Sequence, residues 1–346
     1  MEIVESQFLN GWFFRYLKVS GIYFYGQPKV WQQKLPLAGR KRDFVPDMLQ
    51  AVSAVCCSLL IIAMLADYAL FYLEEIQTYD FFVVVAFINR IHYSGQVPLI
   101  FLACFVCRHR IRKLLRDVSV MASETMSLKD LQIWRNRNSA MIVMWLALCH
   151  GFHLLFISLR TIGFLENAND TVPIFGNKGS IRAPTLIFST LSSASVLLSL
   201  NVDLAVQVFY FSVILIMIRI LHNVHQVLAQ LSGHDAKVTV RTEYSMVDWA
   251  ANVVIRMRQL YKRLNRAFGY IIFLNCMRDL TAMVALMSVL LETDLSVRPG
   301  ETPQQHQKRA SVHDLKQNIV ICEFFISISN AILRWTICAY SHKQVP

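Results

Sequence analysis

The sequence predicts an all-α polytopic membrane protein with six transmembrane helices and a cytoplasmic N-terminus. Six apolar segments are each long enough to cross the hydrocarbon core of a bilayer, which takes about 20 helical residues. The chain is 55% hydrophobic and only 16% charged, a composition typical of polytopic membrane proteins. The expected spans cover residues 48–73, 81–107, 139–164, 185–218, 268–291 and 319–340.

The distribution of Lys and Arg between these segments predicts the orientation. The segment before the first span and those after every second span hold 24 Lys and Arg, whereas the three other connecting segments hold 6. Because basic loops stay in the cytoplasm, the N-terminus is expected inside and six spans return the chain to that side. This asymmetry accounts for the net charge of +11 without a nucleic acid partner.

The N-terminal segment, residues 1–47, is expected to lie at the inner membrane interface. It mixes aromatic residues such as Trp12 and Tyr16 with basic ones, which suits an interfacial helix. Pro28, Pro36 and Pro46 are expected to interrupt this segment before the first span begins. The following outer connection is short, so the first two spans should form a tight antiparallel hairpin.

Helical periodicity continues past several spans. After the basic cluster at 108–113, Leu114, Leu115, Val118 and Met121 recur at helical spacing, so the second span should continue as an amphipathic cytoplasmic helix. Its basic residues would face either anionic membrane lipid or solvent.

Two further cytoplasmic helices are expected between the fourth and fifth spans. The fourth span should continue to Gly233, and another long helix should rise from Asp248. The predicted regions are an N-terminal segment (1–47), four spans (48–218), a cytoplasmic anchor-type helical segment (219–267), two spans (268–340) and a cytoplasmic tail (341–346).

Ionisable residues within the spans are the strongest candidates for a functional or structural site. Each costs about 2.5–3.5 kcal/mol at the centre of a membrane helix, so they normally face the interior of the bundle. Two interpretations remain open, structural ion pairs and the lining of a ligand cavity open to the outer face. The candidates for ion pairing are Asp203, Arg278 and Asp279, with Arg90 as a further partner. The candidates for ligand binding are Asn89, Arg90, His92, Tyr93, Arg160, Glu323 and Ser327.

Motifs of soluble enzymes are absent from the sequence. It contains no GxGxxG, P-loop, HExxH or GxSxG pattern. His150 and His153 form an HxxH pair, for which packing between helices is the expected role. We therefore expect no enzymatic activity, no metal and no cofactor. Asn169 begins a glycosylation sequon on the side that the charge distribution predicts to be outside.

The segment leading into the fifth span resembles the corresponding segment of the insect gustatory receptor family. Tyr261, the pair Leu264-Asn265 and the pair Phe268-Gly269 match its pattern there. The aromatic and basic run 15–23 is similar to the N-terminal lead-in of the same family. The resemblance extends over essentially the whole chain, although its motifs are diffuse.

The resemblance implies a fold of seven helices and a function in taste. Family members are plasma-membrane chemoreceptors that assemble as homo- or hetero-tetrameric, ligand-gated cation channels and bind small-molecule tastants among the outer halves of their helices. The last family helix lines the pore and carries a Thr-Tyr…Gln-Phe signature. We find no such signature before Pro346, so we expect this chain to lack the final pore helix.

Two other classes of membrane protein remain as alternatives. A G-protein-coupled receptor would need an external N-terminus and seven spans, contrary to the charge distribution. A secondary transporter would usually show paired broken helices or repeated halves. Pro98 is the only proline within any expected span, and it has no counterpart in the other half of the chain.

Overall fold

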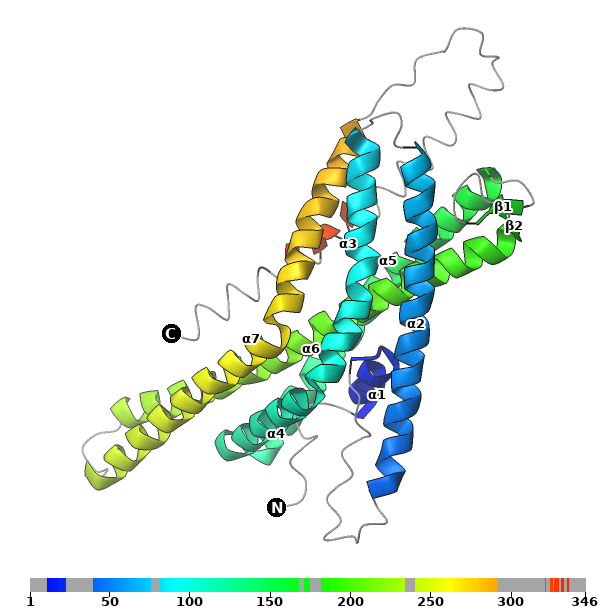
Figure 1. Cartoon of the computed structure of the whole chain (residues 1–346). Coiled ribbons are helices and arrows are strands. Elements are labelled where there is room, and N and C mark those ends of the chain that lie inside the picture. Colours follow the sequence, from blue (N-terminus) through cyan, green and yellow to red (C-terminus); the bar gives the residue numbers. More distant parts are fainter. Residues whose placement is uncertain are drawn as a thin grey trace.

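The computed structural model describes residues 11–22, 40–75, 81–167, 171–174, 182–233 and 240–291, together with isolated residues between 321 and 335. These parts are helical apart from one short β-hairpin (Figure 1). The helices are α1 (Gly11–Val19), α2 (Arg40–Glu75), α3 (Phe81–Val106), α4 (Arg108–Thr125), α5 (Leu128–Asn167), α6 (Thr185–Gly233) and α7 (Val240–Leu291), and the strands are β1 (Thr171–Pro173) and β2 (Arg182–Pro184).

Four helices in the described part of the chain are long and apolar enough to cross a membrane. Their apolar stretches are Gln50–Leu70 in α2, Leu128–Leu159 in α5, Thr185–Gln230 in α6 and Ser245–Val284 in α7. A shorter apolar stretch, Ser94–Val106, belongs to α3. The chain is therefore a multi-pass helical membrane protein by the length and hydropathy of its helices. Most of the sixth expected span, 319–340, lies outside the described residues.

The helices α6 and α7 are much longer than a bilayer requires. They contain 49 and 52 residues, which corresponds to roughly 75 Å each at 1.5 Å per residue. The hydrocarbon core is only about 30 Å thick, so both helices extend well beyond it even when tilted. The described part of α6 reaches Gly233, the residue at which the sequence predicts its end. The helix α7 begins at Val240, eight residues before the predicted start at Asp248.

The helix α4 is a separate element, so the prediction that the second span continues into it is wrong. The chain turns at Cys107, whose φ of −84° and ψ of 2° leave the helical region. Beyond this turn, α4 leaves the direction of α3 (Figure 1). Its apolar stripe, which includes Ile111, Leu114, Leu115 and Val118, is buried, and the helix packs against α6 and α7.

Polar contacts fix the connection from α4 to α5 and one side of α4. The helix ends at Met126, whose extended backbone directs the chain into α5. Ser127 then caps α5, because its Oγ accepts from the Asp130 amide at 3.1 Å and donates to the Asp130 carboxylate at 2.6 Å. On the other side of α4, Arg263 of α7 pairs with Asp117 at 2.6 Å.

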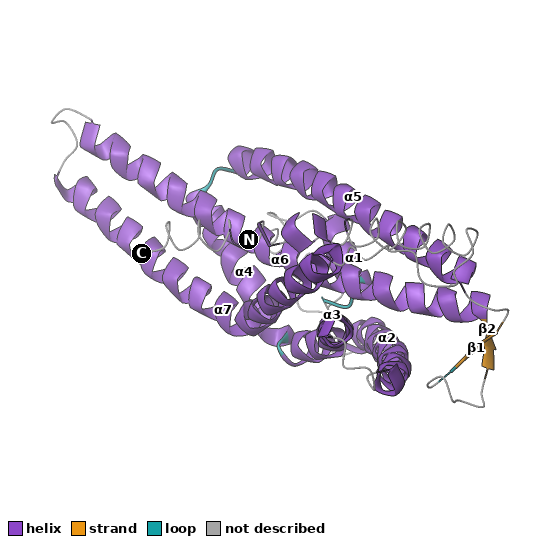
Figure 2. Ribbon diagram, turned by 90° about the horizontal axis from the view of Figure 1, so that it is seen from above, coloured by secondary structure: helices purple, strands orange, loops and turns teal. Residues whose placement is uncertain are grey.

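The connection between α5 and α6 contains a hairpin that the sequence does not predict. Residues 171–173 pair antiparallel with residues 182–184, with Val172 opposite Ala183. This hairpin lies at one end of the bundle, beside the start of α6 (Figures 1 and 2). The sequon residue Asn169 lies outside the described residues.

The N-terminal helix α1 packs inside the bundle, more deeply than an interfacial position predicts. Phe13, Phe14 and Leu17 are at most 3% exposed and belong to the same hydrophobic core as α3, α4, α6 and α7. Seen from above, α5 and α6 run side by side across the view, whereas α2 is seen nearly end on (Figure 2). The helix α2 begins at Arg40, so Pro46 lies within it and does not interrupt the helix.

A left-handed glycine ends α1 and turns the chain back into the core. Gly21 has a φ of 74°, and its amide donates to Lys18 O at 3.1 Å while the Ile22 amide donates to Leu17 O at 2.9 Å. These two bonds form a Schellman cap, with Ile22 and Leu17 both buried. A Cβ at Gly21 would lie 2.4 Å from Phe101 Cε1 of α3.

We predict that Gly21→Ala destabilises the protein markedly. The substitution places an L-residue in the left-handed region, which costs about 1–2 kcal/mol, and adds a collision with the Phe101 ring. Gly151→Ala in α5 is the matched control, since nothing lies within 4 Å of its added Cβ and alanine favours helix by about 1 kcal/mol. Thermal unfolding in detergent should show a lower midpoint for Gly21→Ala alone. Equal midpoints would contradict this account of the cap.

Candidate functional site: a buried polar network between α6 and α7

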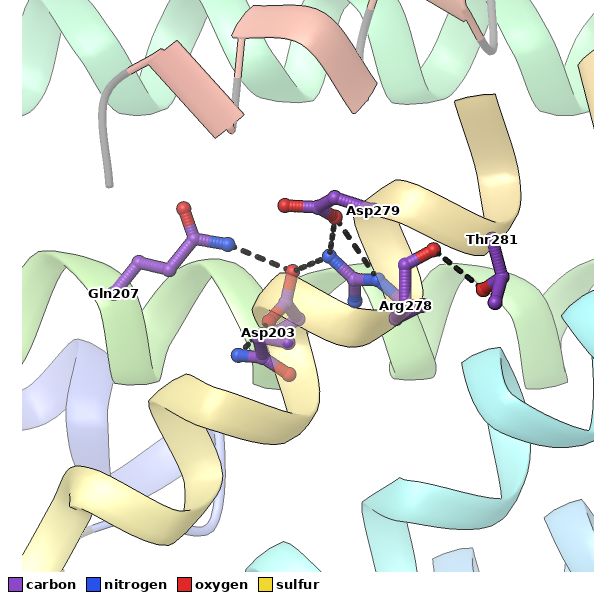
Figure 3. A network of polar contacts seen from close by, with 6 residues as sticks. Asp203, Gln207, Arg278, Asp279 and Thr281 are labelled. Atoms are coloured by element: carbon purple, nitrogen blue, oxygen red, sulfur yellow. Dashed lines mark hydrogen bonds and ion pairs between the residues drawn. The ribbon is translucent and has the colours of Figure 1, made fainter. Parts of the chain in front are cut away.

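Five polar side chains from α6 and α7 meet inside the bundle. Asp203 and Gln207 are four residues apart on α6, so they share one face of that helix. Asn275, Arg278 and Asp279 come from a little more than one turn of α7. The two faces oppose each other and place carboxylate, amide and guanidinium groups within hydrogen-bonding distance (Figure 3).

Arg278 is the centre of this network. Its Nη2 lies 2.8 Å from Asp203 Oδ2 and 2.8 Å from Asp279 Oδ1, and its Nε donates to the same Asp279 oxygen at 3.3 Å. Gln207 Nε2 donates to Asp203 Oδ2 at 2.7 Å, and Asn275 Nδ2 donates to Asp203 Oδ1. The ion pair that the sequence suggests between Arg278 and Asp203 is therefore present.

The charges of this network are almost completely removed from solvent. The side chains of Asp203, Arg278 and Asp279 are 3–4% exposed. Separating one buried charge from its partner costs about 3–5 kcal/mol, because the remaining charge has no water to solvate it. The network therefore holds α6 and α7 together strongly.

Two amide oxygens at the edges of the network accept no hydrogen bond within the part of the chain that the structure describes. They are Gln207 Oε1 and Asn275 Oδ1, on residues that are 1% and 0% exposed. The amide groups of both residues are used to donate to Asp203, which orients the two oxygens away from it. The network thus presents two buried hydrogen-bond acceptors at its edges.

A second polar cluster joins α1 to α6 near this network. Tyr16 donates from its hydroxyl to Asn201 Oδ1 at 3.2 Å, and Asn201 Nδ2 donates to Ser20 Oγ at 3.1 Å. Burial raises the pKa of the Tyr16 phenol above its ordinary value, so the hydroxyl stays protonated and able to donate. Gln50 of α2 donates to Lys18 O at 2.8 Å and adds a further contact to the end of α1.

The two histidines of the HxxH pair pack between helices and against α1. His150 and His153 have ring centroids 5.9 Å apart, and the Tyr16 ring lies 6.3 Å from that of His150. His153 is 2% exposed. No group of three His, Cys, Asp or Glu side chains that could hold a metal occurs within the described ranges.

The residues proposed for an outer ligand pocket are only partly placed. Asn89, Arg90, His92 and Tyr93 follow one another along α3 and Arg160 lies on α5, but their side chains lie outside the described set. Glu323 is also outside it, whereas Ser327 is helical and buried at 8% exposure. Ser94 and Gln96 of α3 are buried as well, and Ser94 Oγ and Gln96 Nε2 have no partner among the described residues.

Two of the motif residues of α7, Asn265 and Phe268, contact α6. Leu264 and Phe268 are 0% exposed, and the Phe268 ring centroid lies 5.2 Å from that of Phe209. Tyr210 donates to Asn265 Oδ1 at 3.2 Å. Tyr261 is half-buried against the same core. A Cβ at Gly269 would meet only Asn265 Cβ at 3.9 Å, so packing within the described part of the chain does not require a glycine there.

These observations define the class of the protein as a multi-pass helical membrane protein whose two longest helices share a buried ion network. Comparison with models of known protein families gives no match, and no curated protein matches the chain.

We predict that Arg278→Met is far more destabilising than Asp203→Asn. The first change leaves two carboxylates buried without the guanidinium, at a cost of about 3–5 kcal/mol. The second change keeps the ion pair between Arg278 and Asp279. It removes an acceptor from the groups that donate to Asp203, which lowers the stability by about 1–3 kcal/mol. Surface expression and the thermal midpoint in detergent measure both effects.

Arg256→Met is the matched control for the loss of an arginine in an ion pair. Its partner Glu124 lies at 2.6 Å, but both side chains are more than 40% exposed, so the loss should stay below about 1 kcal/mol. If Arg278→Met were as mild as this control, the network would not hold α6 and α7 together.

Proposed function

We propose that the protein is a gustatory receptor of the insect chemoreceptor type, a plasma-membrane subunit of a ligand-gated cation channel that detects small-molecule tastants. The observation that carries the proposal is the contact between α7 and α6. Among the residues that resemble the family motif, Asn265 and Phe268 contact Tyr210 and Phe209 of α6, and Leu264 is fully buried beside them on α7. A motif that forms a helix contact has a physical reason to recur among proteins that share one fold.

The length of α6 and α7 also supports the proposal. Each helix extends about 30 Å or more beyond the hydrocarbon core, as the cytoplasmic extensions of such receptors do. In a homo- or hetero-tetramer, these extensions would meet those of neighbouring subunits.

The proposed mechanism is a shift of a closed–open equilibrium by a ligand that enters from outside. The ligand must bind the open state more tightly than the closed state by the free energy of that shift. A pocket at Arg90, His92 and Arg160 would lie toward the outer ends of α3 and α5. The buried network would transmit movement because it fixes α6 to α7, and any displacement of one helix moves the other.

The proposed orientation is tested by epitope tags at the N-terminus and between β1 and β2. We expect a tag at the N-terminus to be stained only after the cells are permeabilised, because 24 of the 30 Lys and Arg in connecting segments lie on that side. A tag inserted at the turn between β1 and β2 should be stained on intact cells. Staining of the N-terminal tag on intact cells would reject the channel proposal and favour a G-protein-coupled receptor.

The proposed pocket is tested by alanine substitution in a cell-based response assay. Cells expressing the chain, alone or with a complete gustatory receptor subunit, are exposed to sugars, bitter compounds and amino acids, and ligand-evoked cation currents are recorded. We expect Arg90→Ala, His92→Ala and Glu323→Ala each to weaken the response by tenfold or more in apparent affinity, the effect of losing about 1.4 kcal/mol.

The matched control is Ile91→Ala, which changes an exposed residue between two of the proposed pocket residues on α3. It should leave the response unchanged. Equal effects of Ile91→Ala and Arg90→Ala would contradict the pocket, and uptake of a solute without a current would favour a transporter.

A further inference from the structure

The outer face of α4 carries an exposed basic surface that none of the proposed functions uses. Its residues lie in the first three turns of the helix, opposite the buried stripe that includes Ile111, Leu114 and Leu115. We call this face the α4 basic surface, and its members are His109, Arg110, Arg112, Lys113 and Arg116.

The α4 basic surface begins where the apolar surface of α3 ends. Leu102 and Val106 are 60% and 66% exposed, so this end of α3 presents a face suited to lipid tails. Arg108 connects the two regions, because its guanidinium lies 4.3 Å from the centroid of the Phe105 ring and donates to Phe105 O at 2.9 Å. Within four residues, the exposed surface changes from purely apolar to strongly cationic.

The acidic residues of α4 pair mainly with α7. Asp117 and Glu124 receive Arg263 and Arg256 of α7 at 2.6 Å each, and Asp117 also lies 3.9 Å from Arg116 at the edge of the basic surface. Arg110 and Lys113 make no ion pair in the part of the chain that the structure describes. Positive charge therefore remains exposed on this face of α4 at Arg110 and Lys113.

The position of these charges is unfavourable for the helix itself. The N-terminal end of a helix carries a partial positive charge, and cations there are destabilising. The first turn of α4 contains no acidic residue. The basic residues are therefore not explained by the stability of α4, whereas a bound anion would relieve both the mutual repulsion and the interaction with the helix dipole.

We propose that the α4 basic surface binds the phosphate and carboxylate groups of an anionic phospholipid, with the lipid tails against the exposed apolar end of α3. A lipid would use both halves of this surface, with its headgroup at Arg110 and Lys113 and its acyl chains against the exposed Leu102 and Val106. A soluble anion would use only the charged half. Clusters of Lys and Arg beside a membrane helix attract anionic lipid, each residue contributing roughly a fivefold increase in association.

The proposal is tested with purified protein in mixed detergent micelles and dansyl-labelled phosphatidylserine, with dansyl-phosphatidylcholine as the neutral reference. Energy transfer from tryptophan to dansyl reports association. We expect the protein to prefer the anionic lipid, and the double variant Arg110→Gln/Lys113→Gln to lose roughly 25-fold of that preference. The double variant Lys129→Gln/Arg258→Gln, which removes two exposed basic residues elsewhere, should retain it.

Three outcomes would overturn the proposal. The first is an equal preference for phosphatidylserine in the two double variants. The second is complete competition by inorganic phosphate at the same charge concentration, which would indicate a site for a free anion. The third is equal binding of both lipids to the unmodified protein. Because the micelle assay needs neither a tastant nor a current, its result is independent of the proposed receptor function.

Discussion

The ion network around Arg278 is the interaction on which the arrangement of the two longest helices depends. Apolar helices surrounded by lipid gain little from the hydrophobic effect when they associate, so packing and polar contacts must hold them together. Arg278 joins Asp203 of α6 to Asp279 of α7 within 2.8 Å. Separating these charges in a low-dielectric interior is costly, so the two helices remain paired at this level.

The network also sets how α7 is aligned with α6 from Arg278 toward Val240. Arg278 meets Asp203, Phe268 meets Phe209 and Asn265 meets Tyr210, so residue numbers fall on α7 as they rise on α6. The pairing is therefore antiparallel and keeps one register from the ion network to the aromatic contact. The remaining residues toward Gly233 and Val240 continue both helices beyond the bilayer core, where α4 packs against them.

The sequence predicts the large features of this fold well, because helix length and apolar content are local properties. Five of the six expected spans coincide with α2, α3, α5, α6 and α7. The separation of α4 from α3 is not predictable in the same way. No Gly or Pro marks Cys107, and the turn there lets the buried apolar stripe of α4 pack against α6 and α7.

The candidate site likewise contains residues that the sequence predicts and residues that it does not. The ionisable members, Asp203, Arg278 and Asp279, are visible in the sequence because charge within an apolar segment is rare. Gln207 and Asn275 were missed, although amides in an apolar segment are also costly to bury and could have served as a signal. Their role depends on the register of α6 against α7, and a single sequence does not contain that information. The position of α1 is also not contained in the sequence. Its aromatic residues suggest a place at the membrane interface, whereas the structure shows that Tyr16 donates a hydrogen bond to Asn201 of α6.

The buried network and the α4 basic surface are connected through the helices α7 and α4. The network fixes α7 to α6 inside the bundle, and α4 packs its buried apolar stripe against α6 and α7 beside the ion pairs of Arg263 and Arg256. A movement of α7 would therefore be passed to α4, whose basic face lies at the end of the apolar surface of α3. An anionic lipid held at that face would resist such movement, so the composition of the membrane would influence the proposed closed–open equilibrium.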